Sequence, residues 1–149
     1  MGAPHEAATM FGHGLIHLDM AGPTLACVYR CAYALTVDDP PKAARLLSVA
    51  IPIAKEHLSG FYLGMPLLPA ATIAAATRRE RMAARLLGAF NQYGKWHPFI
   101  DVSRQNEHLA SQLQDRLGAA IVGDELASGA RLTIAQALQL AEDTIFAMT

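Results

Sequence analysis

The stretch that decides the fold is Met82-Ala83-Ala84-Arg85-Leu86-Leu87-Gly88-Ala89-Phe90, which echoes Lys42-Ala43-Ala44-Arg45-Leu46-Leu47-Ser48-Val49-Ala50. The shared Ala-Ala-Arg-Leu-Leu recurs at a spacing of 40 residues, and each copy follows an alanine-rich segment and a polar turn. Small residues let paired helices approach closely, and a single helix pair cannot bury its own apolar face. The repeat therefore predicts a helix–turn–helix unit present twice, stacked in a tetratricopeptide-like manner.

Proline and glycine separate the remaining segments, which are rich in alanine and leucine and show almost no strand-like alternation. The pattern predicts an all-α protein of seven or eight helices, in antiparallel pairs that form a short superhelical array. Pro52 predicts a kink near Val49 or a break in the expected helix 41–58. Residues 61–65 are expected to form a packed connection. The expected helices are 4–20, 23–36, 41–58, 66–77, 79–93, 101–117, 119–128 (closed by Gly129) and 134–146 (N-capped by Thr133).

A length of 149 residues is that of one domain. We expect residues 1–149 to form a single helical domain with four parts. These are an N-terminal helix in 1–21, a first helix-pair repeat in 22–60, a second in 61–100, and capping helices in 101–149.

Composition narrows the possible partners. Apolar residues make up 52% of the chain and charged residues only 17%, which favours a surface covered by a protein partner or a second copy. The net charge is -1, and Glu80 interrupts the small cluster Arg78, Arg79 and Arg81, which we interpret as a solvated helix start or turn. Nucleic acid is therefore not an expected partner.

The expected location in the cell rests on two features of the sequence. No apolar run approaches the roughly 20 residues that span a bilayer, and the N-terminus lacks the pattern of a signal peptide. We expect no membrane association and a cytoplasmic location in which both cysteines are reduced.

The second copy and the sequence after it resemble a known family. Ala83-Ala84-Arg85-Leu86-Leu87-Gly88-Ala89 is followed by a loop, by a polar helix ending Arg116-Leu117-Gly118, and by Gly129-Ala130-Arg131-Leu132-Thr133 before Ala135-Gln136-Ala137-Leu138-Gln139-Leu140-Ala141. This order is similar to the C-terminal helical repeats of the LuxR/MalT-like and AfsR-like ATPase regulators of bacteria. The resemblance covers about residues 41–145 and implies a tetratricopeptide-like superhelix that senses a ligand or a protein.

The chain also departs from that family. It has no Gly-x-x-x-x-Gly-Lys-Ser/Thr phosphate-binding loop and no basic recognition helix. ATP hydrolysis and DNA binding are therefore not carried over, and what the resemblance leaves is a sensor or scaffold.

Two pairs of residues have metal-ligand character. His13 and His17 lie four residues apart, as do Cys27 and Cys31, on segments expected to be adjacent antiparallel helices. Two histidines and two cysteines form a ligand set that suits zinc. The alternative is a pair of half-exposed histidines and two small core cysteines, since structural zinc ligands usually lie on loops.

Aromatic and apolar residues gather in two connections, where they could line a groove for a ligand or a partner. The alternative is that the aromatic side chains only fasten these connections to the core. The candidate groove residues are Phe61, Tyr62, Met65, Tyr93, Trp96, His97 and Phe99.

No catalytic signature stands out: there is no Gly-x-Ser-x-Gly elbow, and the carboxylate pairs lie at polar helix ends. We expect a non-catalytic regulatory or interaction module without a cofactor, which binds a protein segment or a small apolar effector and is a homo-oligomer. Two alternatives stay open. One is a purely structural homodimer, and the other is a small zinc-binding protein or a hydrolase.

Overall fold

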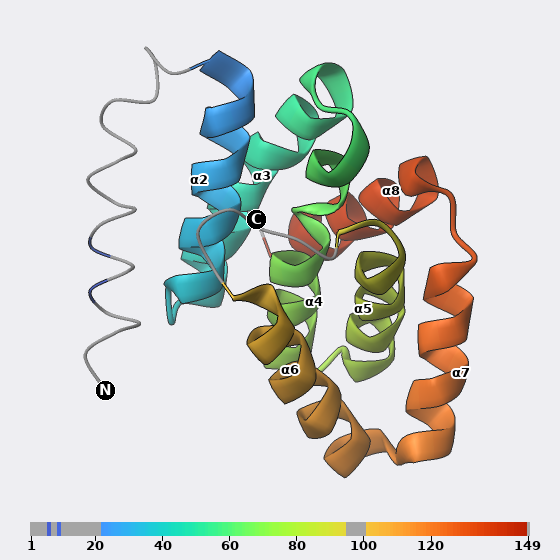
Figure 1. The fold of residues 1–149 in the computed structure, drawn as a ribbon. Coiled ribbons are helices and arrows are strands. Elements are labelled where there is room, and N and C mark those ends of the chain that lie inside the picture. Colours follow the sequence, from blue (N-terminus) through green and yellow to red (C-terminus); the bar gives the residue numbers. More distant parts are fainter. Residues whose placement is uncertain (1–5, 7–8, 10–21, 95–100, 149) are drawn as a thin grey trace.

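The computed structural model describes Glu6, Thr9 and residues 22–94 and 101–148, and these residues form helices and turns without a strand (Figure 1). Of the predicted helix 4–20 only Glu6 and Thr9 are among the described residues, and both are helical; the expected loop 95–99 lies outside the described residues. The described part confirms an all-α fold, with seven α-helices and one 3-10 helix: α2 Gly22–Thr36, α3 Pro40–His57, η2 Gly60–Gly64, α4 Leu67–Ala76, α5 Glu80–Tyr93, α6 Val102–Leu117, α7 Ala119–Ala130 and α8 Ile134–Phe146.

The first pair, α2 and α3, lies side by side in Figure 1 and packs through small side chains. The turn between the helices places Asp39 at the N-cap of α3, where its carboxylate accepts a hydrogen bond from the Lys42 amide at 3.1 Å. Pro40 and Pro41 occupy the first turn, where a missing N–H costs nothing. Local sequence therefore determines where α3 begins.

Pro52 does not break α3, which is one continuous helix of 18 residues. Proline removes the N–H that would bond to the carbonyl of Ser48, but Ser48 and Pro52 both lie on the exposed face. Water can hydrate the carbonyl there, so the helix continues without a break. The alternative, a kink near Val49, stays a prediction.

Helix α4 is the centre of the molecule. Eight of its ten residues are buried, and it contacts α2, α3, α5, α6 and α8. A helix that is apolar on every face belongs in the interior, and its alanines let neighbours approach closely. The predicted connection 61–65 is mostly the 3-10 helix η2, which leads into α4.

The closest packing is between α5 and α7 rather than between chain neighbours α5 and α6. Gly129 was expected to end α7, but the helix continues through it to Ala130. A Cβ added at Gly129 would stand 1.8 Å from the carbonyl oxygen of Arg85, and one at Gly88 would stand 2.1 Å from that of Leu126. Both glycines allow two backbones to touch, which explains why the prediction for Gly129 was wrong.

Helix α8 begins at Thr133, as predicted. The Thr133 hydroxyl accepts from the Gln136 amide at 3.1 Å, and the Gln136 side chain accepts from the Thr133 amide at 2.9 Å. The helix then lies against α3, α4 and α5 (Figure 1). Units of an open array contact only their neighbours, so the superhelical arrangement stays a prediction that this packing does not confirm. None of the described helices is long and apolar enough to cross a membrane.

Candidate functional site: an arginine-walled cleft

The end of α4 carries an unusual residue. The amide of Arg78 bonds to the carbonyl of Ala75 at 3.3 Å, and that of Arg79 to the carbonyl of Ala74 at 2.8 Å. These are the two bonds of a Schellman motif, whose turning residue adopts a left-handed conformation and is usually glycine. Here it is Arg78, with φ of 63°. A long cationic side chain therefore occupies a position whose backbone conformation favours glycine.

Arg79 joins the same turn to α8. Its Nε donates to the hydroxyl of Thr77 at 3.1 Å, and its Nη2 donates to the carbonyl of Thr144 at 2.8 Å. Thr144 is in the last turn of α8, where carbonyls lack a partner within the helix. Arg79 therefore fixes the end of α8 against the α4–α5 turn.

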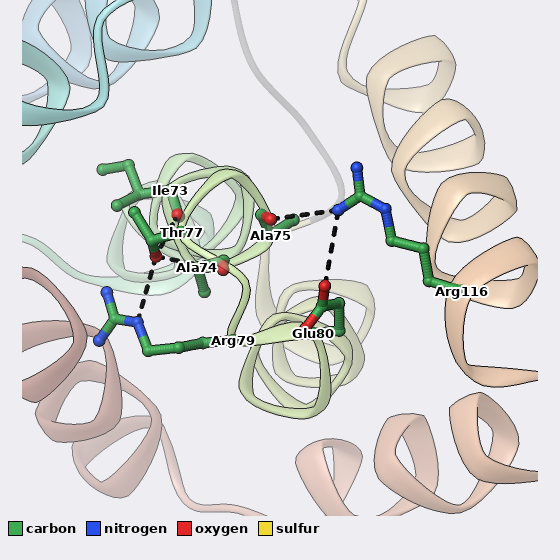
Figure 2. A network of polar contacts seen from close by, with 7 residues as sticks. All are labelled: Ile73, Ala74, Ala75, Thr77, Arg79, Glu80 and Arg116. Atoms are coloured by element: carbon green, nitrogen blue, oxygen red, sulfur yellow. Dashed lines mark hydrogen bonds and ion pairs between the residues drawn. The ribbon is translucent and has the colours of Figure 1, made fainter.

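Arg116, on α6, reaches the turn from the opposite side of α4 (Figure 2). It donates to the carbonyl of Ala75 at 3.2 Å and lies 3.8 Å from a carboxylate oxygen of Glu80. The two arginines thus hold the α4–α5 turn between α6 and α8.

Arg81 and Arg85 project from α5 toward Glu125 of α7. Arg85 makes a two-point contact with Oε2 of Glu125, from Nε at 2.9 Å and from Nη2 at 2.8 Å. Arg81 stands 3.9 Å from the other oxygen, Oε1. Glu125 is only 8% exposed, and a buried carboxylate needs such a partner because burial removes its hydration.

These groups surround an open cleft of about 560 Å³. Most of its lining residues are charged, and its apolar residues come from α5, α6 and α8. The lining residues are Arg78, Arg79, Glu80, Arg81, Met82, Arg85, Leu117, Glu125 and Leu140. A concave surface with a few converging polar groups over apolar side chains is the usual form of a binding site.

The predicted aromatic groove is placed only in part. Trp96, His97 and Phe99 lie outside the described residues, as does the side chain of Phe61. The two connections do meet, because a Cβ at Gly64 would stand 2.6 Å from the Tyr93 backbone. Met65 is buried, Tyr62 is half-buried, and the hydroxyl of Tyr93 donates to the carbonyl of Leu132 at 2.6 Å. Tyr93 therefore ties α5 to the α7–α8 turn, and the groove itself stays a prediction.

Cys27 and Cys31 face α3 from α2, and both are fully buried. Their sulfurs are 4.0 Å apart, and Cys27 Sγ donates to the carbonyl of Ala50 at 3.5 Å. The hydrogen bond with Cys27 and the burial of the thiol raise the pKa of Cys31 well above its ordinary value of 9.0. The two thiols are therefore packed as small core side chains in the protein without metal, which is the alternative that the sequence offered for them.

The zinc prediction is not tested further, because His13 and His17 lie outside the described residues. Within the part that can be described, no group of three or more His, Cys, Asp or Glu side chains has the geometry to hold a metal ion.

Three of the nine residues that line the cleft were singled out from the sequence as an arginine cluster. Arg78, Arg79 and Arg81 were interpreted as a solvated helix start or turn, and they do lie at the α4–α5 turn and the start of α5, where Arg78 and Arg81 are exposed. Their place in the lining of the cleft was not predicted. Arg85 and Glu125 are 40 residues apart, and nothing local to either residue signals the ion pair. The Ala-Ala-Arg-Leu-Leu repeat singled out Arg85, although as part of a packing unit.

Comparison with known proteins adds no assignment to this geometry: no family model, curated protein or solved structure matches the chain.

Proposed function

We propose that this protein is a non-catalytic interaction module that binds a segment of a partner protein in the arginine-walled cleft. The observation that carries the proposal is the lining of the cleft, in which six charged side chains accompany Met82, Leu117 and Leu140. Such charged side chains orient a polar backbone while the apolar side chains take up an anchor residue. The resemblance to the helical repeats of bacterial ATPase regulators supports a regulatory role of this kind.

Side-chain contacts tie together the helices around the cleft, which supports a site that is formed before its partner binds. Arg79 fixes α8, Arg116 fixes α6, and Arg85 is paired with Glu125 on α7. A site whose walls are held by such contacts loses little conformational entropy when it is filled.

A homodimer is the second candidate. Phe146 is 69% exposed and borders a small apolar hollow between α3 and α8, of about 150 Å³, that Ile51, Pro52 and Ile145 also line. An exposed apolar hollow with an aromatic residue in its lining is a surface that two copies related by a two-fold axis could cover. Sedimentation of the wild type and of Phe146→Ser at micromolar concentration tests this candidate, which requires a dimer that the substitution dissociates.

Site-specific photocross-linking tests the leading proposal. A benzoylphenylalanine at position 117, inside the cleft, is compared with one at position 92, since Gln92 is exposed on α5 and does not line the cleft. Both variants are irradiated in cells that naturally make the protein, and the adducts are identified by mass spectrometry.

The proposal requires a heterologous protein adduct at position 117 that is absent at position 92, and binding of that purified protein must weaken in Leu117→Trp, which fills the cleft. Equal adducts at the two positions contradict it. A cross-link between two copies of the chain at position 117 would indicate self-assembly through the cleft and would contradict the binding of a partner protein there.

A further inference from the structure

The charges of the cleft point to the chemistry of its occupant. We infer that the occupant is an acidic protein segment, whose carboxylates bind between Arg78 and Arg81 while an apolar side chain of the segment contacts Met82, Leu117 and Leu140. This inference rests on the proposed function, because it names the partner class of the same cleft.

The side chains that line the cleft carry more positive than negative charge. Four arginines and two glutamates line the cleft, an excess of two positive charges in a chain whose net charge is -1. The carboxylate of Glu125 is used by Arg85, and that of Glu80 lies beside Arg116. Arg81 shares the Glu125 carboxylate at the longer distance of 3.9 Å, and neither Arg78 nor Arg79 forms an ion pair within the described residues.

Arg81 is the more accessible member of the α5 pair. Its side chain is 66% exposed, and its distance of 3.9 Å from Glu125 exceeds that of a hydrogen bond. Since Arg85 already occupies Oε2 of that carboxylate, the Arg81 guanidinium has donors available for a ligand. A planar guanidinium with free donors suits a carboxylate, which it can bind through two parallel hydrogen bonds.

Arg78 contributes the second free cation. Its side chain is exposed, and no ion pair or hydrogen bond of its guanidinium occurs within the described part of the chain. Its left-handed conformation is one that glycine adopts without strain. An arginine at a strained backbone position supports a binding role for its side chain, since such strain is concentrated at ligand-binding sites.

Arg79 completes the positive field without being free itself. Its partners are a hydroxyl and a carbonyl, which orient the guanidinium but do not neutralise its charge. A carboxylate between Arg78 and Arg81 would therefore also experience the field of a fixed third cation.

The same inventory disfavours a nucleic acid. A phosphate backbone needs an extended basic surface, and the carboxylates of Glu80 and Glu125 within the lining would repel it. The apolar residues offer no aromatic ring on which a base could stack. One or two carboxylates beside an apolar anchor match this cleft better.

Fluorescence anisotropy with the full chain tests the inference. The probe is a fluorescein-labelled ten-residue peptide of alternating Glu and Leu, compared with its Gln/Leu counterpart and with a single-stranded RNA of ten nucleotides, each at low and at physiological salt. We expect binding of the acidic peptide that is at least about tenfold tighter than that of the Gln/Leu peptide and weakens as salt increases.

Three variants locate the binding. Arg81→Gln and Arg78→Gly should each weaken binding about tenfold, which corresponds to one charge-assisted contact. Arg45→Gln is the control, because Arg45 is an exposed arginine of a neighbouring helix, α3, that does not line the cleft, and it should leave binding unchanged. If Arg78 had only a structural role, the Arg78→Gly variant would be more stable than the wild type and would bind the acidic peptide at least as tightly.

Other results overturn the inference. Equal affinity for both peptides, an equal effect of Arg45→Gln, or binding of the RNA instead of the acidic peptide would each do so. Specific binding of the Gln/Leu peptide that Leu117→Trp abolishes would leave the proposed function standing without the acidic partner. If no peptide binds, the acidic partner is excluded, and the cross-linking at position 117 decides the proposed function separately.

Discussion

Gly129 of α7 lies directly against the main-chain carbonyl of Arg85 on α5, so closely that a Cβ would stand 1.8 Å from that oxygen. Gly88 has the reciprocal relationship with Leu126, at 2.1 Å. The two contacts bring α5 and α7 together with backbone on backbone. This close approach sets the separation across which Arg85 reaches Glu125.

Substitution of these glycines by alanine should therefore be costly. In Gly129→Ala the helices must separate, and we expect a loss of about 2–3 kcal/mol in the free energy of unfolding, typical of overpacking. Gly88→Ala should behave alike. Urea denaturation monitored by circular dichroism measures the effect.

Gly123→Ala is the matched control on the same helix, because a Cβ there has nothing within 4 Å. It should stabilise the protein by about 0.5–1 kcal/mol, since alanine is the better helix former. If all three variants lost the same free energy, the close α5–α7 contact would not be what the glycines provide.

The Arg85–Glu125 pair should show energetic coupling. Arg85→Met leaves the nearly buried Glu125 carboxylate with only Arg81, at 3.9 Å. We expect this variant to lose about 1–3 kcal/mol, the cost of a buried charged group without its hydrogen bonds. In a double-mutant cycle with Glu125→Gln, the coupling free energy should exceed about 0.5 kcal/mol. Additive effects would show that the pair contributes nothing as a pair.

Arg78→Gly should stabilise the folded protein by about 1 kcal/mol, because glycine adopts the left-handed conformation without the clash of a Cβ. Arg78→Ala keeps that clash and should give no such gain. Thermal unfolding of both variants measures the difference. Equal stability of the two would mean that the backbone at position 78 is not strained.

Cys31 should make stability depend on alkaline pH. A raised pKa means that the folded state holds the thiol proton more tightly than the unfolded state does. This contribution is complete below the ordinary pKa of 9.0 and is lost as pH increases above it. The free energy of unfolding, measured in reducing buffer at pH 7 and pH 10, should decline more in the wild type than in Cys31→Ala. Parallel declines would contradict a protonated buried thiol.

Tyr93→Phe tests the role of one predicted groove residue. The substitution removes the hydrogen bond to the Leu132 carbonyl and should lower the free energy of unfolding by about 1 kcal/mol. Leu132 belongs to the turn before α8, so hydrogen exchange should accelerate at that turn. A variant as stable as the wild type would favour the ligand-lining role over the anchoring role.

The features that could be predicted from the sequence are those that depend on contacts between residues close together in the chain. Thr133 caps α8 through contacts within three residues, as predicted, and α3, capped by Asp39, begins within one residue of the expected position 41. Gly129 was misjudged because the same residue type ends a helix or permits a close contact, and only the partner helix decides which. The predicted pairing of chain neighbours could not reveal that α5 packs mainly on α7.

The candidate site was harder to predict for the same reason. Arg78, Arg79 and Arg81 form an exposed turn and helix start, as the sequence indicates, and their long-range contacts are what the sequence does not show. Glu125 lies 40 residues from Arg85, and Thr144 lies 65 residues from Arg79. Sequence alone therefore identifies the cations but not the residues of α7 and α8 that lie beside them.

The burial of α4 has a consequence for how the molecule opens. Because neighbours surround this helix, its amide hydrogens have no local route to water, and their exchange should report global unfolding. An open solenoid can lose an end unit and keep the rest, whereas this chain would expose its central alanines if α8 detached. The fold is therefore expected to be lost as one cooperative unit, and a partner that engages the Arg79–Thr144 contact at the cleft would stabilise all of it.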